Sequence, residues 1–161
     1  MMPVRRALLV NCGLLLAGCA SGPRQAPTAF WSGRLGLLLQ SEPPQSLQAA
    51  FELQGSAQQG ELTLLGPLGT VLAQLRWTPL QATLERGQEQ WTQRNVQELT
   101  EQLLQTPLPI QALFDWIQGR AIAPAGWEVD LSAHQEGRIL ARRALPSPTA
   151  VLRILLDPTT P

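Results

Sequence analysis

One stretch of the chain, residues 61–77 (ELTLLGPLGTVLAQLRW), limits the possible folds more than any other part of the sequence. Apolar and polar residues alternate on both sides of a central break, which is the period of a half-buried β-strand. The break is Gly66-Pro67-Leu68-Gly69, in which two glycines can adopt positive φ and a proline fixes its own φ. We therefore expect a strand, a turn and a second strand.

Leu68 places a large apolar side chain at the tip of this expected turn. The residues alone leave two interpretations open. Either the leucine folds back onto the core, or it stays outside and contacts a membrane or a partner.

The rest of the body continues the strand pattern on both sides of a helical segment. Asn95 and Glu98 have the spacing of a helix N-cap and its capping partner, and a second helix should begin near Pro109 and stop at Gly119. Both apolar stripes are narrow, so we expect one-sided helices lying against a curved sheet in an α+β fold. Strand candidates are residues 30–40, 47–53, the two arms of 61–77, 81–86, 89–92, 127–131, 138–145 and 150–156, which we interpret as about eight antiparallel strands.

The first 29 residues have the pattern of an export signal followed by an anchor. Arg5 and Arg6 precede a short apolar run, which at about ten residues is too brief to span a bilayer. The ending Leu16-Ala17-Gly18-Cys19 resembles the bacterial lipobox, which implies cleavage after residue 18 and acylation of Cys19. Residues 19–29 then form an acylated N-terminus and a flexible tether. In the sorted lipoproteins of Gram-negative bacteria that this segment resembles, an aspartate directly after the cysteine favours inner-membrane retention. Ala20 and Ser21 stand at those positions here, so the resemblance implies the outer membrane.

Length and composition indicate one domain, at residues 30–157, with a frayed tail at 158–161. The 12 arginines balance 12 acidic residues without runs of like charge, so nucleic acid is not an expected partner. Both cysteines lie within the first 19 residues, which leaves no thiol in the folded body for a disulfide or a nucleophile. The five tryptophans could line a pocket, but we favour ordinary core packing.

The sequence shows no arrangement typical of catalysis. Glu98 and Glu101 share the solvent side of the first helix, and His134, the only histidine, lies in a polar turn without further metal ligands. Asp115 lies between apolar neighbours and is the one acidic residue that a buried site could use. Phosphate-binding glycine loops and serine elbows are absent from the sequence. We therefore expect that the protein is not an enzyme and that it binds neither a metal nor a cofactor.

Several segments together resemble the family of the outer-membrane lipoprotein receptor LolB, from about Phe30 to Asp157. Besides the lipobox, the matching segments are 31–36 (WSGRLG), 62–69 (LTLLGPLG), 108–110 (LPI) followed by Leu113, 116–120 (WIQGR), 126–129 (GWEV) and 152–157. One departure is a short segment between Gly119 and Trp127, where the family commonly has an extra strand. The link from Leu131 to Arg138 is also brief, so we expect a more open barrel.

The resemblance implies an incompletely closed antiparallel β-barrel with helices covering an apolar cavity. It implies a monomer that accepts acylated lipoproteins from the periplasmic carrier LolA and inserts them into the inner leaflet of the outer membrane of a Gram-negative bacterium. Its partners would be LolA, the acyl chains of the cargo and outer-membrane lipid, with Leu68 as the membrane-insertion residue. Candidate cavity residues are Trp31, Leu35, Phe51, Leu53, Leu62, Leu64, Leu75, Trp91, Leu99, Leu113, Trp116, Ile117, Trp127 and Val129.

An acyl chain exposed to water costs on the order of 10 kcal/mol, from ~0.8 kcal/mol per methylene, so transfer between membranes requires an apolar pocket. The alternative is a structural or assembly lipoprotein that binds another envelope protein and has no acyl cavity. An enzyme would require an acidic residue or His134 in a cleft.

Overall fold

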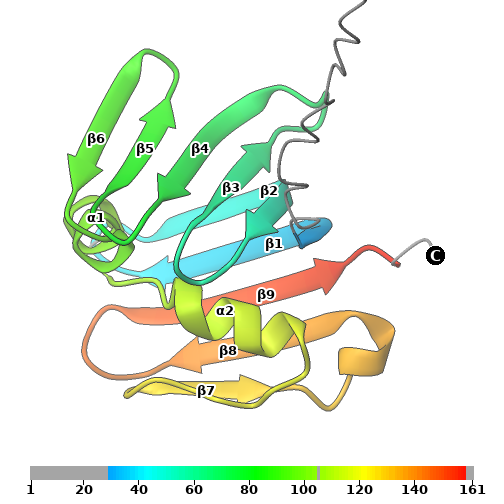
Figure 1. Ribbon diagram of the computed structural model, residues 1–161. Helices are drawn as coiled ribbons and strands as arrows, with labels where there is room; N and C mark the ends of the chain where they lie inside the picture. The colour runs from blue at the N-terminus through cyan, green and yellow to red at the C-terminus, as the bar shows by residue number, and fades with distance from the viewer. Residues whose placement is uncertain (1–28, 105, 159–161) are drawn as a thin grey trace, which may run out of the picture.

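The computed structural model describes residues 29–104 and 106–158. The expected signal, Cys19 and most of the tether lie outside the described residues. The described part forms one antiparallel sheet in the order β6-β5-β4-β3-β2-β1-β9-β8-β7 (Figure 1). The strands are β1 (Phe30–Gln40), β2 (Gln45–Gly55), β3 (Gly60–Leu65), β4 (Val71–Trp77), β5 (Ala82–Arg86), β6 (Glu89–Gln93), β7 (Trp127–Asp130), β8 (Arg138–Arg143) and β9 (Thr149–Leu156).

The sheet is curved but not closed, because β6 and β7 are its two edges and do not pair with each other. Helices α1 (Val96–Leu104) and α2 (Ile110–Ile117) connect these edges and lie on one face of the sheet (Figure 1). This arrangement confirms the expected α+β class and the incompletely closed antiparallel sheet. The described part contains nine strands where about eight were expected, and the short β5 and β6 pair along all five of their residues.

The central hairpin forms where the sequence predicts it. The Gly69 N–H donates to the Gly66 carbonyl at 2.9 Å, and the Gly66 N–H donates to the Thr70 carbonyl at 2.8 Å. Gly69 has φ 74°, which an L side chain rarely adopts. Pro67 occupies the second position of the tight turn, which its fixed φ favours.

Helix α1 begins as the capping pattern predicts. The Asn95 side-chain oxygen accepts a hydrogen bond from the Glu98 N–H at 2.9 Å. An N-cap of this kind satisfies one of the backbone donors that the first turn of a helix leaves unpaired. Helix α1 then lies beside β5 and β6 and contributes the fully buried Leu99 to the core.

Helix α2 lies against the sheet as expected, but its buried face is wider than the narrow stripe that the sequence predicts. Six of its eight residues are buried, and only Gln111 and Asp115 are not. The reason is tertiary: Phe114 packs against Trp31 and Trp77 on β1 and β4, whereas Trp116 packs against Trp127 on the edge strand β7 of the same sheet, with ring centroids 6.0 Å apart. Two parts of the same curved sheet therefore contact this short helix.

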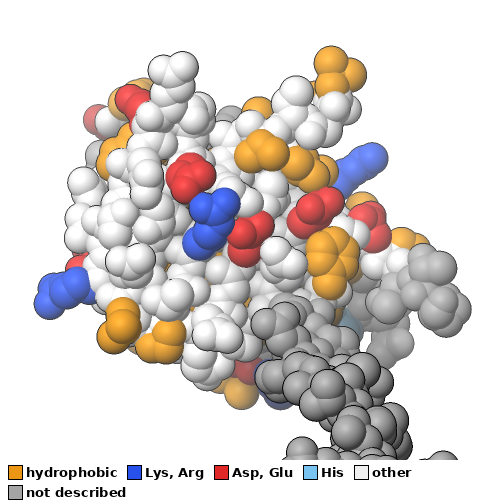
Figure 2. Space-filling model, turned by 45° about the horizontal axis from the view of Figure 1, so that its top comes forward, with side chains coloured by type: hydrophobic (Ala, Val, Ile, Leu, Met, Phe, Trp, Pro, Cys, Tyr) orange, Lys and Arg blue, Asp and Glu red, His pale blue; other side chains and the backbone are white. Residues whose placement is uncertain are grey.

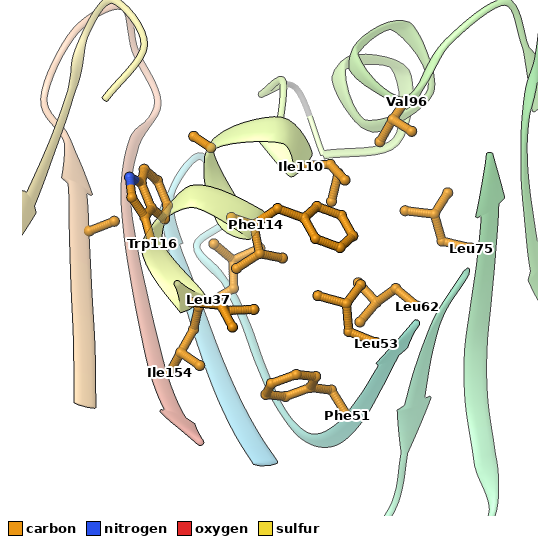
Figure 3. Close-up of a cluster of buried hydrophobic side chains, with 14 of the residues drawn as sticks. Leu37, Phe51, Leu53, Leu62, Leu75, Val96, Ile110, Phe114, Trp116 and Ile154 are labelled. Atoms are coloured by element: carbon orange, nitrogen blue, oxygen red, sulfur yellow. The ribbon is translucent and has the colours of Figure 1, made fainter. Parts of the chain in front are cut away.

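Aromatic contacts fix α2 on the concave face of the sheet. The Phe114 ring lies edge-on to Trp31 of β1 at 5.6 Å and to Trp77 of β4 at 6.1 Å between centroids. Figure 3 shows Phe114 pointing from α2 into the group that contains Leu53 and Leu62. The Trp116 indole N–H also donates to the Ile122 carbonyl at 2.8 Å. Each aromatic pair adds about 0.5–1.5 kcal/mol beyond area burial, so these contacts hold α2 on the sheet.

Candidate functional site

An apolar hollow of about 310 Å³ lies between the concave face of the sheet and the two helices. Leucine is its most frequent lining residue, and Gln45, Arg86 and Thr100 are its few polar ones. Gln45 begins β2, Leu72 lies near the start of β4, and Arg86 ends β5. In this antiparallel sheet those termini lie at one end, which is also the end where the β3–β4 turn carries Leu68. The hollow therefore reaches the surface near the leucine loop.

Eight of the candidate cavity residues line this hollow. They come from five strands and both helices, because strand periodicity correctly separates the two faces of the sheet. They are Leu35, Phe51, Leu62, Leu64, Leu75, Trp91, Leu99 and Leu113.

The other six candidates do not line the hollow. Leu53 and Trp116 have no exposed surface and belong to solid core, and Trp31 packs against Phe114. The remaining three follow α2 away from the hollow towards the β7 edge or lie in that edge; they are Ile117, Trp127 and Val129.

Further lining residues were missed by the sequence analysis. Some continue the inward-facing positions of strands already identified, so the period-2 pattern could have found them; these are Leu37, Leu47, Ala73, Leu84, Leu152 and Ile154. Leu72 was not foreseeable in this way, because a register shift between Leu64 and Leu65 turns it towards the hollow. Leu103, Leu104, Leu108, Pro109 and Ile110 complete the roof.

Thr100 joins α1 to the segment that leads into α2. Its buried hydroxyl donates to the Val96 carbonyl at 2.9 Å and accepts a hydrogen bond from the Leu108 N–H at 2.9 Å. Both Thr100 and Leu108 line the hollow. One side-chain hydroxyl thus holds two parts of the roof together.

Leu68 stands in solvent with 92% of its surface exposed. Val71, two residues after the turn, is also exposed, while Leu64 and Leu72 on the two arms line the hollow. The loop therefore presents an apolar tip from a base that forms part of the cavity wall.

Asp115 and His134, the titratable residues weighed in the sequence analysis, both make hydrogen bonds that stabilise the local structure. The Asp115 carboxylate accepts two hydrogen bonds from the Arg120 guanidinium, the shorter at 2.6 Å, and is not buried. His134 Nε2 lies 2.9 Å from the Ile117 carbonyl and donates to it, which ties the 3₁₀ turn His134–Glu136 to the end of α2. Over residues 29–104 and 106–158, no three His, Cys, Asp or Glu side chains gather as metal ligands.

Charges on the convex face of β3, β4 and β5 compensate one another. The Arg76 guanidinium pairs with Glu61 and Glu85 at 2.9 Å each. Partial burial by itself raises the pKa of Glu61, but hydrogen bonds from Arg76 and Gln74 and the charge of Arg76 outweigh it, so this pKa lies below its ordinary value. Figure 2 shows acidic and basic side chains close together on one face, where hydrophobic side chains protrude at separate points. In the described part of the chain, no helix is both long and apolar enough to span a membrane.

Comparison with known proteins gives a consistent result. The family model described as outer membrane lipoprotein LolB matches residues 30–144. Over 149 residues the chain is 34% identical to the outer-membrane lipoprotein LolB of Bordetella petrii, covering 86% of this chain and 73% of the relative. The LolB proteins of Chromobacterium violaceum (30% identity, 83% and 78% covered) and Cupriavidus necator (31% identity, 98% of each covered) are similar. The open sheet, its helical roof and these matches lead to one conclusion: the chain belongs to the LolB family of outer membrane lipoproteins.

Proposed function

We propose that this chain is a receptor that accepts acylated lipoproteins from the periplasmic carrier LolA and inserts them into the inner leaflet of the outer membrane. The observation that carries the proposal is the apolar hollow, which reaches the surface at the same end of the sheet as the exposed Leu68. A pocket that suits acyl chains thus lies beside a side chain that suits a bilayer.

The size of the hollow makes the roof part of the mechanism. At roughly 30 Å³ for each small group, the volume of a water molecule in the liquid, 310 Å³ holds on the order of ten methylene-sized groups. A cargo with several acyl chains therefore requires the roof to move outward. Because aromatic contacts hold α2 on the sheet, α1 and the segment at Leu108 are the part that moves in our proposal.

Transfer by this route needs no reaction chemistry. An acyl chain moves from carrier to receptor if the receptor hollow binds it more favourably, and moves on if the bilayer binds it better still. The driving force is burial of methylene groups at ~0.8 kcal/mol each. This series of transfers uses neither nucleotide hydrolysis nor a catalytic residue.

Two contacts with the membrane have separate roles in the proposal. Acyl chains on Cys19 keep the receptor at the outer membrane. Leu68 enters the inner leaflet and brings the mouth of the hollow to the lipid, so that acyl chains leave the hollow without crossing water. Burying one leucine contributes roughly 1.5–3 kcal/mol, which suits a reversible contact.

A transfer assay tests the proposal. The chain from residue 19 with Cys19→Ala, which cannot be acylated, is mixed with LolA that carries a labelled lipoprotein, and the label is followed to the chain and then to added vesicles. We expect the Cys19→Ala chain to accept and deliver cargo. The same chain with Leu68→Glu added should accept cargo but fail to deliver it. A folded chain that takes no cargo would contradict the receptor function and favour a structural lipoprotein. Equal delivery by Leu68→Glu would contradict the role of the loop.

A further inference from the structure

The sheet has a second concave feature, on the face opposite the acyl hollow, which the proposed function does not use. It is a shallow groove of about 910 Å³ bounded at one side by Gly66 and Pro67 of the leucine loop. Asp130, Ser132 and Ala133, at and after the end of β7, bound its other side. We call it the convex-face groove.

Strand register explains which side chains meet in this groove. Arg34 of β1 pairs with Ala50 of β2 and with Leu155 of β9, and Leu155 pairs with Arg138 of β8. In the next row, Gly36 of β1 pairs with Arg153 of β9. All of these residues line the groove, so three arginines gather around a floor kept low by a glycine and an alanine.

Two of these arginines have no ion pair within the described part of the chain. Arg138 pairs with Glu136, whereas neither Arg34 nor Arg153 has a carboxylate within 4.0 Å among the described residues. Because Arg34 and Arg153 occupy diagonal positions on neighbouring strands, their Cβ atoms are separated by about 7–8 Å or somewhat less. Glu52 on β2 lies diagonal to Arg34 and Asp130 lies at the edge of the groove, but neither carboxylate is within 4.0 Å of Arg34 or Arg153, so a bound anion would be their direct partner.

The surroundings separate this groove from the rest of the surface. On the neighbouring half of the same face, Arg76 is balanced by Glu61 and Glu85. Leu65, Leu140 and Leu155 place apolar surface among the groove arginines. Unpaired guanidinium groups beside apolar side chains match the interface of a lipid bilayer, where phosphates lie above glycerol and acyl chains.

We propose that the convex-face groove binds the phosphate groups of anionic glycerophospholipids at the membrane surface, with Arg34 and Arg153 as the phosphate-binding residues. The choice of a membrane over an acidic protein follows from continuity, since Gly66 and Pro67 form both the wall of the groove and the base of Leu68. The orientation of the groove towards the bilayer rests on the proposed membrane contact of Leu68. The groove supplies charge where Leu68 supplies burial, and together they fix how the receptor approaches the leaflet.

Vesicle binding of the chain with Cys19→Ala tests this proposal, because its core lies within residues 30–156 and needs no acyl anchor. Binding is measured on phosphatidylcholine vesicles with and without phosphatidylglycerol. Arg34→Gln with Arg153→Gln should weaken binding to the anionic vesicles, by about fivefold for each arginine and ~25-fold together. Binding to neutral vesicles should not change. High salt should remove the difference, because it screens exposed charges.

The control variant loses the same number of positive charges, but at surface positions outside the groove. Arg76→Gln with Arg94→Gln removes two exposed arginines that already have carboxylate partners. This variant should bind both kinds of vesicle like the unaltered chain. An equal loss in both double variants would overturn the proposal, because net charge alone would then explain binding. No loss in the Arg34 and Arg153 variant would also overturn it.

Two further measurements distinguish lipid from other anionic ligands, and distinguish failure of the groove from failure of the proposed membrane contact of Leu68. Soluble glycerol phosphate or polyglutamate that binds the chain through Arg34 and Arg153, without any response of the chain to anionic lipid, would overturn the membrane assignment. Leu68→Glu should weaken binding to neutral and anionic vesicles alike. If Leu68→Glu has no effect while the arginine variant still loses anionic binding, the groove is supported and the membrane contact of Leu68 fails separately.

Discussion

Replacing Leu68 by alanine should weaken membrane binding without weakening the fold. The side chain is 92% exposed, so its removal takes no packing from the core. In the bilayer, about three buried carbon groups are lost at ~0.8 kcal/mol each, or about 2 kcal/mol. Since 1.4 kcal/mol corresponds to a tenfold change, partition into vesicles should fall roughly 30-fold.

The assay is co-sedimentation of the Cys19→Ala chain with neutral vesicles, combined with urea unfolding of the same samples. Leu80→Ala is the matched control, because Leu80 is 85% exposed and lies beyond the opposite end of β4. It should leave partition unchanged. If Leu68→Ala and Leu80→Ala lower partition equally, exposed apolar area rather than the position of the loop determines binding, and our reasoning is refuted.

Three further variants test the roof, the helix start and the surface charges. Thr100→Val leaves the part-buried Leu108 N–H without its acceptor, so stability should fall by about 1 kcal/mol in urea unfolding while stopped-flow uptake of a fluorescent fatty acid becomes faster; slower uptake would contradict the moving roof. Asn95→Ala should cost about 1 kcal/mol of unfolding free energy, and Asn95→Asp should restore most of it, because aspartate also caps. Glu61→Gln should lower stability at neutral pH, because the pKa of Glu61 is below its ordinary value in the folded chain and its contribution is present above the unfolded pKa. The difference should vanish in thermal melts as pH falls through the folded pKa, and a difference that grows in acid would contradict the pairing with Arg76.

Much of the fold could be predicted because its signals are local. The alternation in β2, the turn at Gly66 and the cap at Asn95 each depend on neighbouring residues only, and each is found where expected. The family and the outer-membrane location inferred from the sequence are confirmed by the comparisons. The membrane role of Leu68 and the acylation of Cys19 stay predictions.

The lining of the hollow could not be predicted as well, because empty space depends on contacts between distant elements. Leu53 and Leu64 lie on the same face of the sheet, yet Leu53 is in solid core while Leu64 faces the hollow. Nothing in the sequence near these residues states where α2 lies. The burial of α2 on most sides likewise depends on Trp127, which follows it by ten residues and lies on the far edge strand. Periodicity identifies a face, but packing decides which part of that face stays open.

Binding of a fluorescent fatty acid to a hollow-filling variant tests the central claim most directly. Ala73 lines the hollow, so Ala73→Phe should fill part of it, whereas Thr83→Phe adds the same ring on the convex face of β5. The account predicts saturable binding that unlabelled fatty acid competes, weakened by Ala73→Phe and unchanged by Thr83→Phe. Binding that does not saturate, or that both variants alter equally, would contradict an acyl-binding interior.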